Sequence, residues 1–143
     1  MPTDISILVY IGSPLDYVKY RHTAVFLRST DGTKILMHVK GTSGLFEFED
    51  RYDYNPDQSD ALAKTVPVAE LPDSISVASI KSAISSTVVR NGRDDMDWNC
   101  QNWVGDALTR LVDNGYLSAT QRIAAVDQMA SACSEAKDED DAI

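Results

Sequence analysis

Apolar and polar residues alternate in the first half of the chain in the manner of β-strands. Short runs rich in β-branched residues occupy residues 4–11, 22–28 and 34–40. Residues 44–49 (GLFEFE) alternate apolar and acidic side chains, which indicates an edge strand with one solvated face. We interpret the tyrosine- and aspartate-rich stretch that follows as a surface loop or a lid over a substrate. Residues 65–72 form another short extended segment held by two prolines.

In the second half the apolar residues recur at helical spacing. The pattern predicts a helix over residues 74–89 and a strongly amphipathic helix over 98–113. Asn114 and Gly115 end the second helix as a left-handed cap. A capping box at residues 118–121 opens a last helix. Strands come first and helices second, so we expect the α+β class.

The turn between the second and third strands decides which side chains share a face. A two-residue turn at Asp31-Gly32 would put His22 and His38 on opposite faces. A three-residue loop with this glycine in the left-handed region would instead pair Ser29 with Thr33. That register leaves one face nearly all apolar, so we favour it. It makes the two histidines diagonal neighbours on the other face, roughly 7–8 Å apart at most between backbones.

Composition and charge narrow the class of protein. The 143 residues carry a net charge of −9, which argues against nucleic acid and anionic membranes as partners. No apolar run approaches the roughly 18 residues of a membrane span, and no signal peptide is evident. Two distant cysteines make no disulfide framework, so a cytoplasmic location is the default expectation. We expect one domain over residues 1–133 and a disordered acidic tail over 134–143.

Cys100 stands at the predicted start of the second helix. Counting back three positions from Trp103, on the apolar stripe, places the thiol on the same buried face. Asp97 and Asn99 are the candidate caps. The N–H groups and partial positive charge of a helix start stabilise a thiolate and lower the thiol pKa. Position alone nevertheless favours a small buried apolar residue, the interpretation we give to Cys133 in the last helix.

A catalytic thiol needs a base, and His22 and His38 are the two histidines of the chain. On one strand face they offer a base and a group that orients it, as thiol catalysis requires. One histidine alone would be an ordinary strand residue, but two on one face with Cys100 available favour catalysis. The same three side chains could bind zinc if they converged. They lack the compact spacing of zinc ligands, so we expect no metal and no cofactor.

The order of these motifs resembles the circularly permuted papain-like cysteine enzymes. The nearest likenesses are the lecithin:retinol acyltransferase-like and the PPPDE desumoylating isopeptidase-like proteins. NCQNWVGDALTRLVDNG is similar to their nucleophile helix, HTAVFLR to the strand of their base, and ILMHVKG supplies the second histidine of the acyltransferase-like group. The resemblance covers about residues 5–115. It implies a permuted papain-like fold with Cys100 as nucleophile, His22 as base and His38 as third member.

Two departures bear on the substrate. The acyltransferase-like group has Glu-His after its cysteine, where this chain has Gln101-Asn102. Membrane-bound members of that group carry a hydrophobic tail, where this chain has an acidic one. We therefore favour a peptidase- or amidase-like enzyme over a lipid acyltransferase.

The sequence predicts a thiol-dependent hydrolase or acyl transferase acting on an amide, ester or thioester. The substrate would be a peptide, a modified protein or a small molecule. The alternative is a non-catalytic binding module on the same fold. The candidates to hold an oxyanion are the N–H of Cys100 and the hydroxyls of Tyr10 and Tyr17. The candidates to line the substrate cleft are Trp98, Asn99, Gln101 and Trp103.

An acidic loop precedes the helix that begins near Cys100. Its carboxylates are those of Asp94, Asp95 and Asp97. They would oppose thiolate formation and attract a cationic substrate. We prefer the simpler interpretation of an acidic loop that includes a helix cap.

Overall fold

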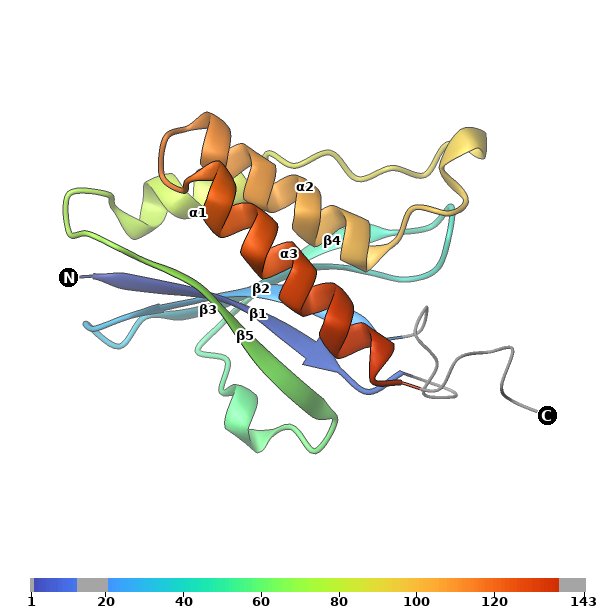
Figure 1. The fold of residues 1–143 in the computed structure, drawn as a ribbon, viewed down its shortest axis with the longest axis horizontal. Helices are drawn as coiled ribbons and strands as arrows, with labels where there is room; N and C mark the ends of the chain where they lie inside the picture. Colours follow the sequence, from blue (N-terminus) through green and yellow to red (C-terminus); the bar gives the residue numbers. More distant parts are fainter. Residues whose placement is uncertain (1, 13–20, 137–143) are drawn as a thin grey trace.

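The strands of the first half form one antiparallel sheet, and the helices of the second half cover one of its faces (Figure 1). The structure, a computed structural model, describes residues 2–12 and 21–136. Within these ranges the sheet has five strands in the order β4-β3-β2-β1-β5. The strands are β1 (Thr3–Tyr10), β2 (His22–Ser29), β3 (Lys34–Lys40), β4 (Glu47–Tyr52) and β5 (Leu62–Leu71). The predicted α+β class is confirmed.

The two outer strands differ from the sequence expectation. β4 begins at Glu47 and continues to Tyr52, so it uses residues of the stretch expected to be a loop or lid. β5 is longer than the expected extended segment and pairs with β1 along most of its length. Between them a single turn of 3-10 helix covers Pro56–Gln58. This turn lies on the side of the sheet away from the helices (Figure 1).

The β2–β3 turn is the predicted three-residue loop. The N–H of Ser29 donates to the carbonyl of Thr33 at 2.9 Å, and Gly32 has φ of +96°. Val25 pairs with Met37 in the same register. His22 and His38 therefore share the face of the sheet opposite to these apolar side chains, as predicted.

The helices begin and end at the residues that cap them. They are α1 (Val77–Ser85), α2 (Cys100–Asp113) and α3 (Ala119–Ser134). α1 is shorter than predicted because the Ser76 side chain accepts the N–H of Ser79 and so starts the helix late. Gly115 has φ of +77° and ends α2 as predicted. The capping box of Ser118 and Gln121 opens α3.

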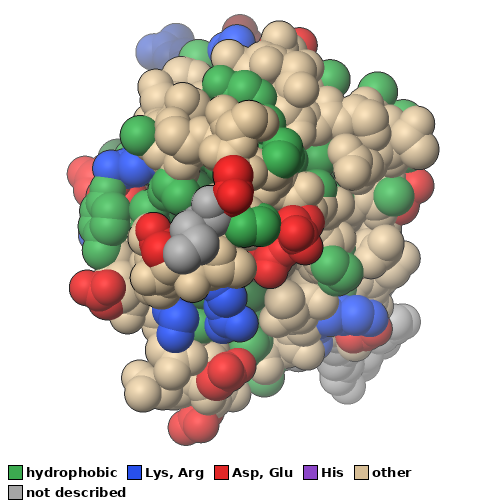
Figure 2. Space-filling model, turned by 90° about the vertical axis from the view of Figure 1, so that its left-hand side faces the viewer, with side chains coloured by type: hydrophobic (Ala, Val, Ile, Leu, Met, Phe, Trp, Pro, Cys, Tyr) green, Lys and Arg blue, Asp and Glu red, His purple; other side chains and the backbone are tan. Residues whose placement is uncertain are grey.

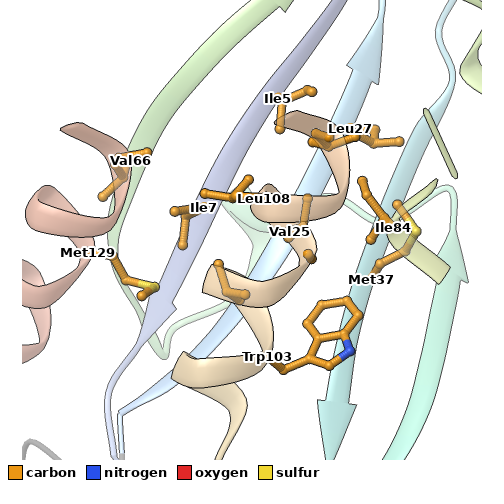
Figure 3. Close-up of a cluster of buried hydrophobic side chains, with 14 of the residues drawn as sticks. Ile5, Ile7, Val25, Leu27, Met37, Val66, Ile84, Trp103, Leu108 and Met129 are labelled. Atoms are coloured by element: carbon orange, nitrogen blue, oxygen red, sulfur yellow. The ribbon is translucent and has the colours of Figure 1, made fainter. Parts of the chain in front are cut away.

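The main core lies between the helices and the first face of the sheet. Figure 3 shows Trp103 and Leu108 of α2 against Val25 of β2, with Met129 of α3 on one flank and Ile84 of α1 on the other. Trp103, Leu108 and Ile84 are fully buried. The apolar stripe of α2 thus packs on the apolar face of the sheet.

The second face of the sheet carries a smaller cluster. It consists of Leu8, Tyr10, Ala24, Phe26 and Leu36, with the partly buried Tyr54 and Leu62 packed against it. Tyr54 and Leu62 come from the segment between β4 and β5 and the start of β5. This face therefore has a thin cover, and the two histidines lie on it.

Charged side chains of both signs are spread over the surface. Figure 2 shows the end of the molecule at which β1 begins, where acidic and basic side chains alternate with polar and apolar ones. The predicted acidic tail falls mainly on residues 137–143, outside the described residues, while Ser134 still belongs to α3. In the part of the chain that the structure describes, no helix is long and apolar enough to cross a membrane.

Candidate active site

α2 begins at Cys100 because the preceding residue caps it. The Asn99 side chain accepts the N–H groups of Gln101 at 3.0 Å and Asn102 at 3.4 Å. The Asn102 side chain in turn accepts the N–H of Asn99 at 3.0 Å, which completes a capping box. Of the two candidate caps, Asn99 is correct and Asp97 is not. Cys100 is thereby fixed as the first helical residue, with only 8% of its surface exposed.

The Cys100 thiol lies where the β2–β3 ladder opens. The paired residues of the two strands end at Val25 and Met37, although β2 starts at His22 and β3 continues to Lys40. The N–H of Ser29 points to β3, so the other odd-numbered residues of β2 also direct their backbone groups that way. Thr23 of β2 and Arg21, which directly precedes the strand, are the residues that interact with the sulfur.

The Cys100 thiol lies against the start of β2. Its Sγ lies 3.8 Å from the carbonyl oxygen of Arg21, and the Thr23 N–H also interacts with the sulfur. The Gln101 side-chain amide donates to the same Arg21 carbonyl at 3.1 Å. The thiol therefore interacts with the residues on both sides of His22.

The resting thiol is protonated. Burial raises the pKa of Cys100, and the hydrogen bonds from Thr23 and from the N–H groups of the helix start lower it without reversing the shift. The N–H groups of the helix start lower the thiol pKa, as expected, but desolvation is the larger effect. Cys133 packs in the core at 1% exposure, and burial raises its pKa to about 11. It is an inert packing residue, as predicted.

The two histidines are hydrogen-bonded to each other. Nε2 of His22 lies 2.6 Å from Nδ1 of His38, with the rings edge to face. Burial and the neighbouring His38 lower the pKa of His22 to about 4, so this imidazole is neutral at pH 7. The predicted diagonal pair is thus a direct contact between a half-buried, neutral imidazole and a second ring.

The hydrogen bonds of the histidine pair continue to a carboxylate, Glu49, that was not among the predicted site residues. Nε2 of His38 lies 2.9 Å from Oε1 of Glu49, its direct partner across the β3–β4 ladder. Lys40 and Arg51 hold the same carboxylate at 2.9 and 3.2 Å. Hydrogen bonds from Lys40 and His38 lower the pKa of Glu49 to about 2. The alternating GLFEFE segment carried the signal, because extending the strand order by one hairpin sets Glu49 opposite His38.

Tyr10 lies beside the histidine pair. It pairs with His22 across β1 and β2, and the two ring centroids are 6.0 Å apart. Its hydroxyl is 2.5 Å from that of Tyr54, and burial raises the pKa of Tyr10. Tyr17, the other tyrosine candidate, lies outside the described residues.

The thiol and the histidines lie on opposite sides of the sheet, near the start of β2. Cys100 belongs to the core cluster on the helix side, whereas His22 and His38 share the second face with Tyr10. Among the described residues, the sulfur is hydrogen-bonded to the backbone of β2 rather than to an imidazole. The structure therefore brings the two histidines into contact and brings the thiol to the strand that carries His22.

The proposed cleft residues have separate roles. Trp103 is wholly buried in the core, so it does not line an open surface. Trp98 is half-buried and donates from its indole N–H to Asp106 at 3.1 Å. Asn99 is the cap, and Gln101 reaches over the thiol to β2.

The three aspartates of the acidic loop lie at or near the surface, and the zinc interpretation finds no support among the described residues. Asp94 and Asp97 are exposed and Asp95 is half-buried, at and beyond a single 3-10 turn that covers Arg93–Asp95. Within residues 2–12 and 21–136, no three histidine, cysteine or acidic side chains converge in a way that could hold a metal ion.

Comparison with protein families assigns the chain to one family. The model of DUF6540, a family of unknown function, matches residues 9–118. The chain is a member of DUF6540. The DUF6540 match contains His22, His38, Glu49 and Cys100, and it ends before α3 begins. Searches among curated proteins and among solved structures gave no match.

Proposed function

We propose that this DUF6540 protein is a thiol-dependent hydrolase or acyl transferase that acts on an amide, ester or thioester. Cys100 is the nucleophile, His22 the base and His38 its partner. The observation that carries the proposal is the meeting of two features at one end of β2. The helix-start thiol contacts the carbonyl of Arg21, and the next residue, His22, is hydrogen-bonded to His38.

The hydrogen-bonded pair of half-buried His22 and buried His38 supports a chemical role over a packing role. Burying polar rings disfavours folding unless their hydrogen bonds are satisfied, and apolar residues would pack this face more favourably. The neighbouring positions on this face, Ala24 and Phe26, are apolar. A neutral imidazole at pH 7 is also the form that a general base requires.

The reaction that we propose follows the usual course of thiol catalysis. His22 takes the proton of the Cys100 thiol, and the thiolate attacks the substrate carbonyl carbon. The N–H of Cys100 is the first donor for the oxyanion, because the Asn99 side chain engages the N–H groups of the next two residues. The leaving group takes the proton back from His22, and water or a second acceptor then releases the acyl group from the sulfur.

The fold proposal is the permuted papain-like one. Its support is the order of the elements: a histidine strand, a second histidine strand, and a later helix that begins with Asn-Cys. Gln101 and Asn102 replace the Glu-His pair of the acyltransferase-like group, and Asn102 is used in the capping box. We therefore propose peptides, modified proteins or small amides as substrates before lipids.

Comparative thiol labelling tests the proposal. The two cysteines are both buried and both have a raised pKa, so Cys133 is an internal control for Cys100. We expect iodoacetamide to modify Cys100 at least tenfold faster than Cys133 at pH 7, because only Cys100 contacts the strand segment that carries the proposed base, His22. His22→Ala should remove the difference. Equal and slow labelling of both cysteines would contradict the proposal.

Adduct trapping addresses the substrate class. Mass spectrometry of the intact protein after incubation with activated esters, thioesters and peptide amides should show an acyl group on Cys100 and none in Cys100→Ala. The chemistry of the trapped group then separates ester from amide substrates.

One observation favours a second function, that of a non-catalytic binding module. The resting thiol is protonated and hydrogen-bonded to the β2 backbone. If this is its only role, Cys100→Ser should retain the fold and ligand binding, and no reagent should distinguish the two cysteines.

A further inference from the structure

Glu49 ends the row of hydrogen bonds that starts at His22. The row runs from β2 through His38 on β3 to β4, with distances of 2.6 and 2.9 Å. Only 26% of the Glu49 side chain is exposed. Lys40 holds its Oε2, and Arg51 holds the Oε1 that faces His38. Three strands and two cations thus fix one carboxylate on one imidazole nitrogen.

The donor and acceptor chemistry of this row permits one arrangement of protons. An ionised carboxylate only accepts hydrogen bonds, so Nε2 of His38 must carry its proton. When His38 is neutral, its Nδ1 is therefore an acceptor, and Nε2 of His22 must donate to it. A neutral His22 protonated at Nε2 has its lone pair on Nδ1. The carboxylate at the far end thereby decides which nitrogen of His22 is the base.

We propose that Glu49 is a positioning residue, which fixes the proton positions of the histidine pair and balances the charge that the pair acquires. The proposal rests on the proposed function. When the thiol proton binds Nδ1 of His22, the proton on Nε2 moves to Nδ1 of His38. The S–H bond breaks, two N–H bonds form and one N–H bond breaks. The products are the Cys100 thiolate and a His38 imidazolium beside Glu49.

The surrounding groups agree with this role. The charged and titratable groups around the pair are Tyr10 from β1, Lys40 from β3, and Glu49 and Arg51 from β4. Glu49 is the one anion among them in its resting state. Lys40 and Arg51 hold it in place, but neither contacts the imidazole that would become charged. Proton transfer from His22 to His38 places the imidazole ring of His22 between the thiolate and the positive charge.

Two variants and a matched control test the proposal. Glu49→Gln retains an acceptor but removes the charge, and Glu49→Leu removes both. Glu47 is the control, because it lies on the same strand and face, is exposed, and pairs with Lys40 instead of His38. Slow labelling of the buried Cys133 confirms in each sample that the variant is folded.

The first readout is the tautomer of each ring, which NMR measures from the ¹⁵N chemical shifts of the imidazole nitrogens. We expect protons on Nε2 of both His22 and His38 in the wild type and in Glu47→Gln. Glu49→Leu should give mixed tautomers. A wild-type His38 protonated at Nδ1 would overturn the proposal, whatever the reactivity of the thiol.

The second readout is the pH profile of Cys100 alkylation. Glu49→Gln should slow the reaction about tenfold at pH 7 by moving the profile up about one pH unit, and Glu47→Gln should leave it unchanged. A reactive wild-type Cys100 whose profile Glu49→Gln does not move would overturn the role of Glu49 alone. A wild-type Cys100 no faster than Cys133 would overturn the proposed function and this role with it.

Discussion

The half-buried, neutral His22 makes folding stability depend on pH in a defined window. Its pKa is about 4 in the folded protein and 6.5 in the unfolded chain. Between these values the unfolded state binds one more proton than the folded state, so stability falls as the pH falls. From pH 7 to pH 5 the loss from this one residue is about 2 kcal/mol, and it reaches about 3 kcal/mol near pH 4.

Urea unfolding followed by tryptophan fluorescence measures this loss. Other groups titrate in the same window, so the informative quantity is the difference between the wild type and His22→Asn, which does not titrate. We expect the free energy of unfolding of the wild type to fall by about 2 kcal/mol more than that of the variant between pH 7 and pH 5. Parallel pH dependences of the two proteins would refute the argument that His22 is half-buried and neutral.

Three further substitutions test the elements that hold the site. Asn99→Ala should lower the free energy of unfolding by about 1 kcal/mol through loss of the α2 cap, and Asn99→Ser should restore most of it; full stability of the alanine variant would show that the cap is dispensable. Trp103→Ala should cost about 3–5 kcal/mol because this side chain is fully buried, as thermal or urea unfolding would show. Gly41→Ala should cost about 1–3 kcal/mol, since φ is +114° and a Cβ would lie 2.7 Å from the carbonyl oxygen of Leu45; an unchanged unfolding midpoint would argue against this backbone conformation.

Local chemistry made much of the fold predictable from the sequence. Gly32 at a left-handed position set the β2–β3 register, and that register placed His22 and His38 on one face. Ser118 and Gly115 marked helix ends by capping, which depends on near neighbours in the chain. These signals are short-range, so a single sequence reveals them.

Long-range features of the site were not predictable in the same way. The role of Glu49 depends on a second hairpin, whose loop over residues 41–46 is too long to fix the register from its residue types. β4 also begins three residues later than the pattern indicated. The pKa of Cys100 depends on the balance of desolvation against the N–H groups of α2 and Thr23. That balance is a property of the packed structure and leaves no pattern in the sequence.

The contact of the Cys100 sulfur with the start of β2 has a consequence for hydrogen exchange in that strand. The sulfur contacts the backbone at the start of β2, so a group attached to it must displace the thiol from the Arg21 carbonyl and the Thr23 N–H. If the proposed function holds, an acyl intermediate would exclude the resting contact, and each turnover would include a local loosening of β2. The Thr23 amide hydrogen should accordingly exchange with solvent faster in the acylated protein than at rest. Acylation of the Cys100 sulfur would thus raise the rate at which the start of β2 opens.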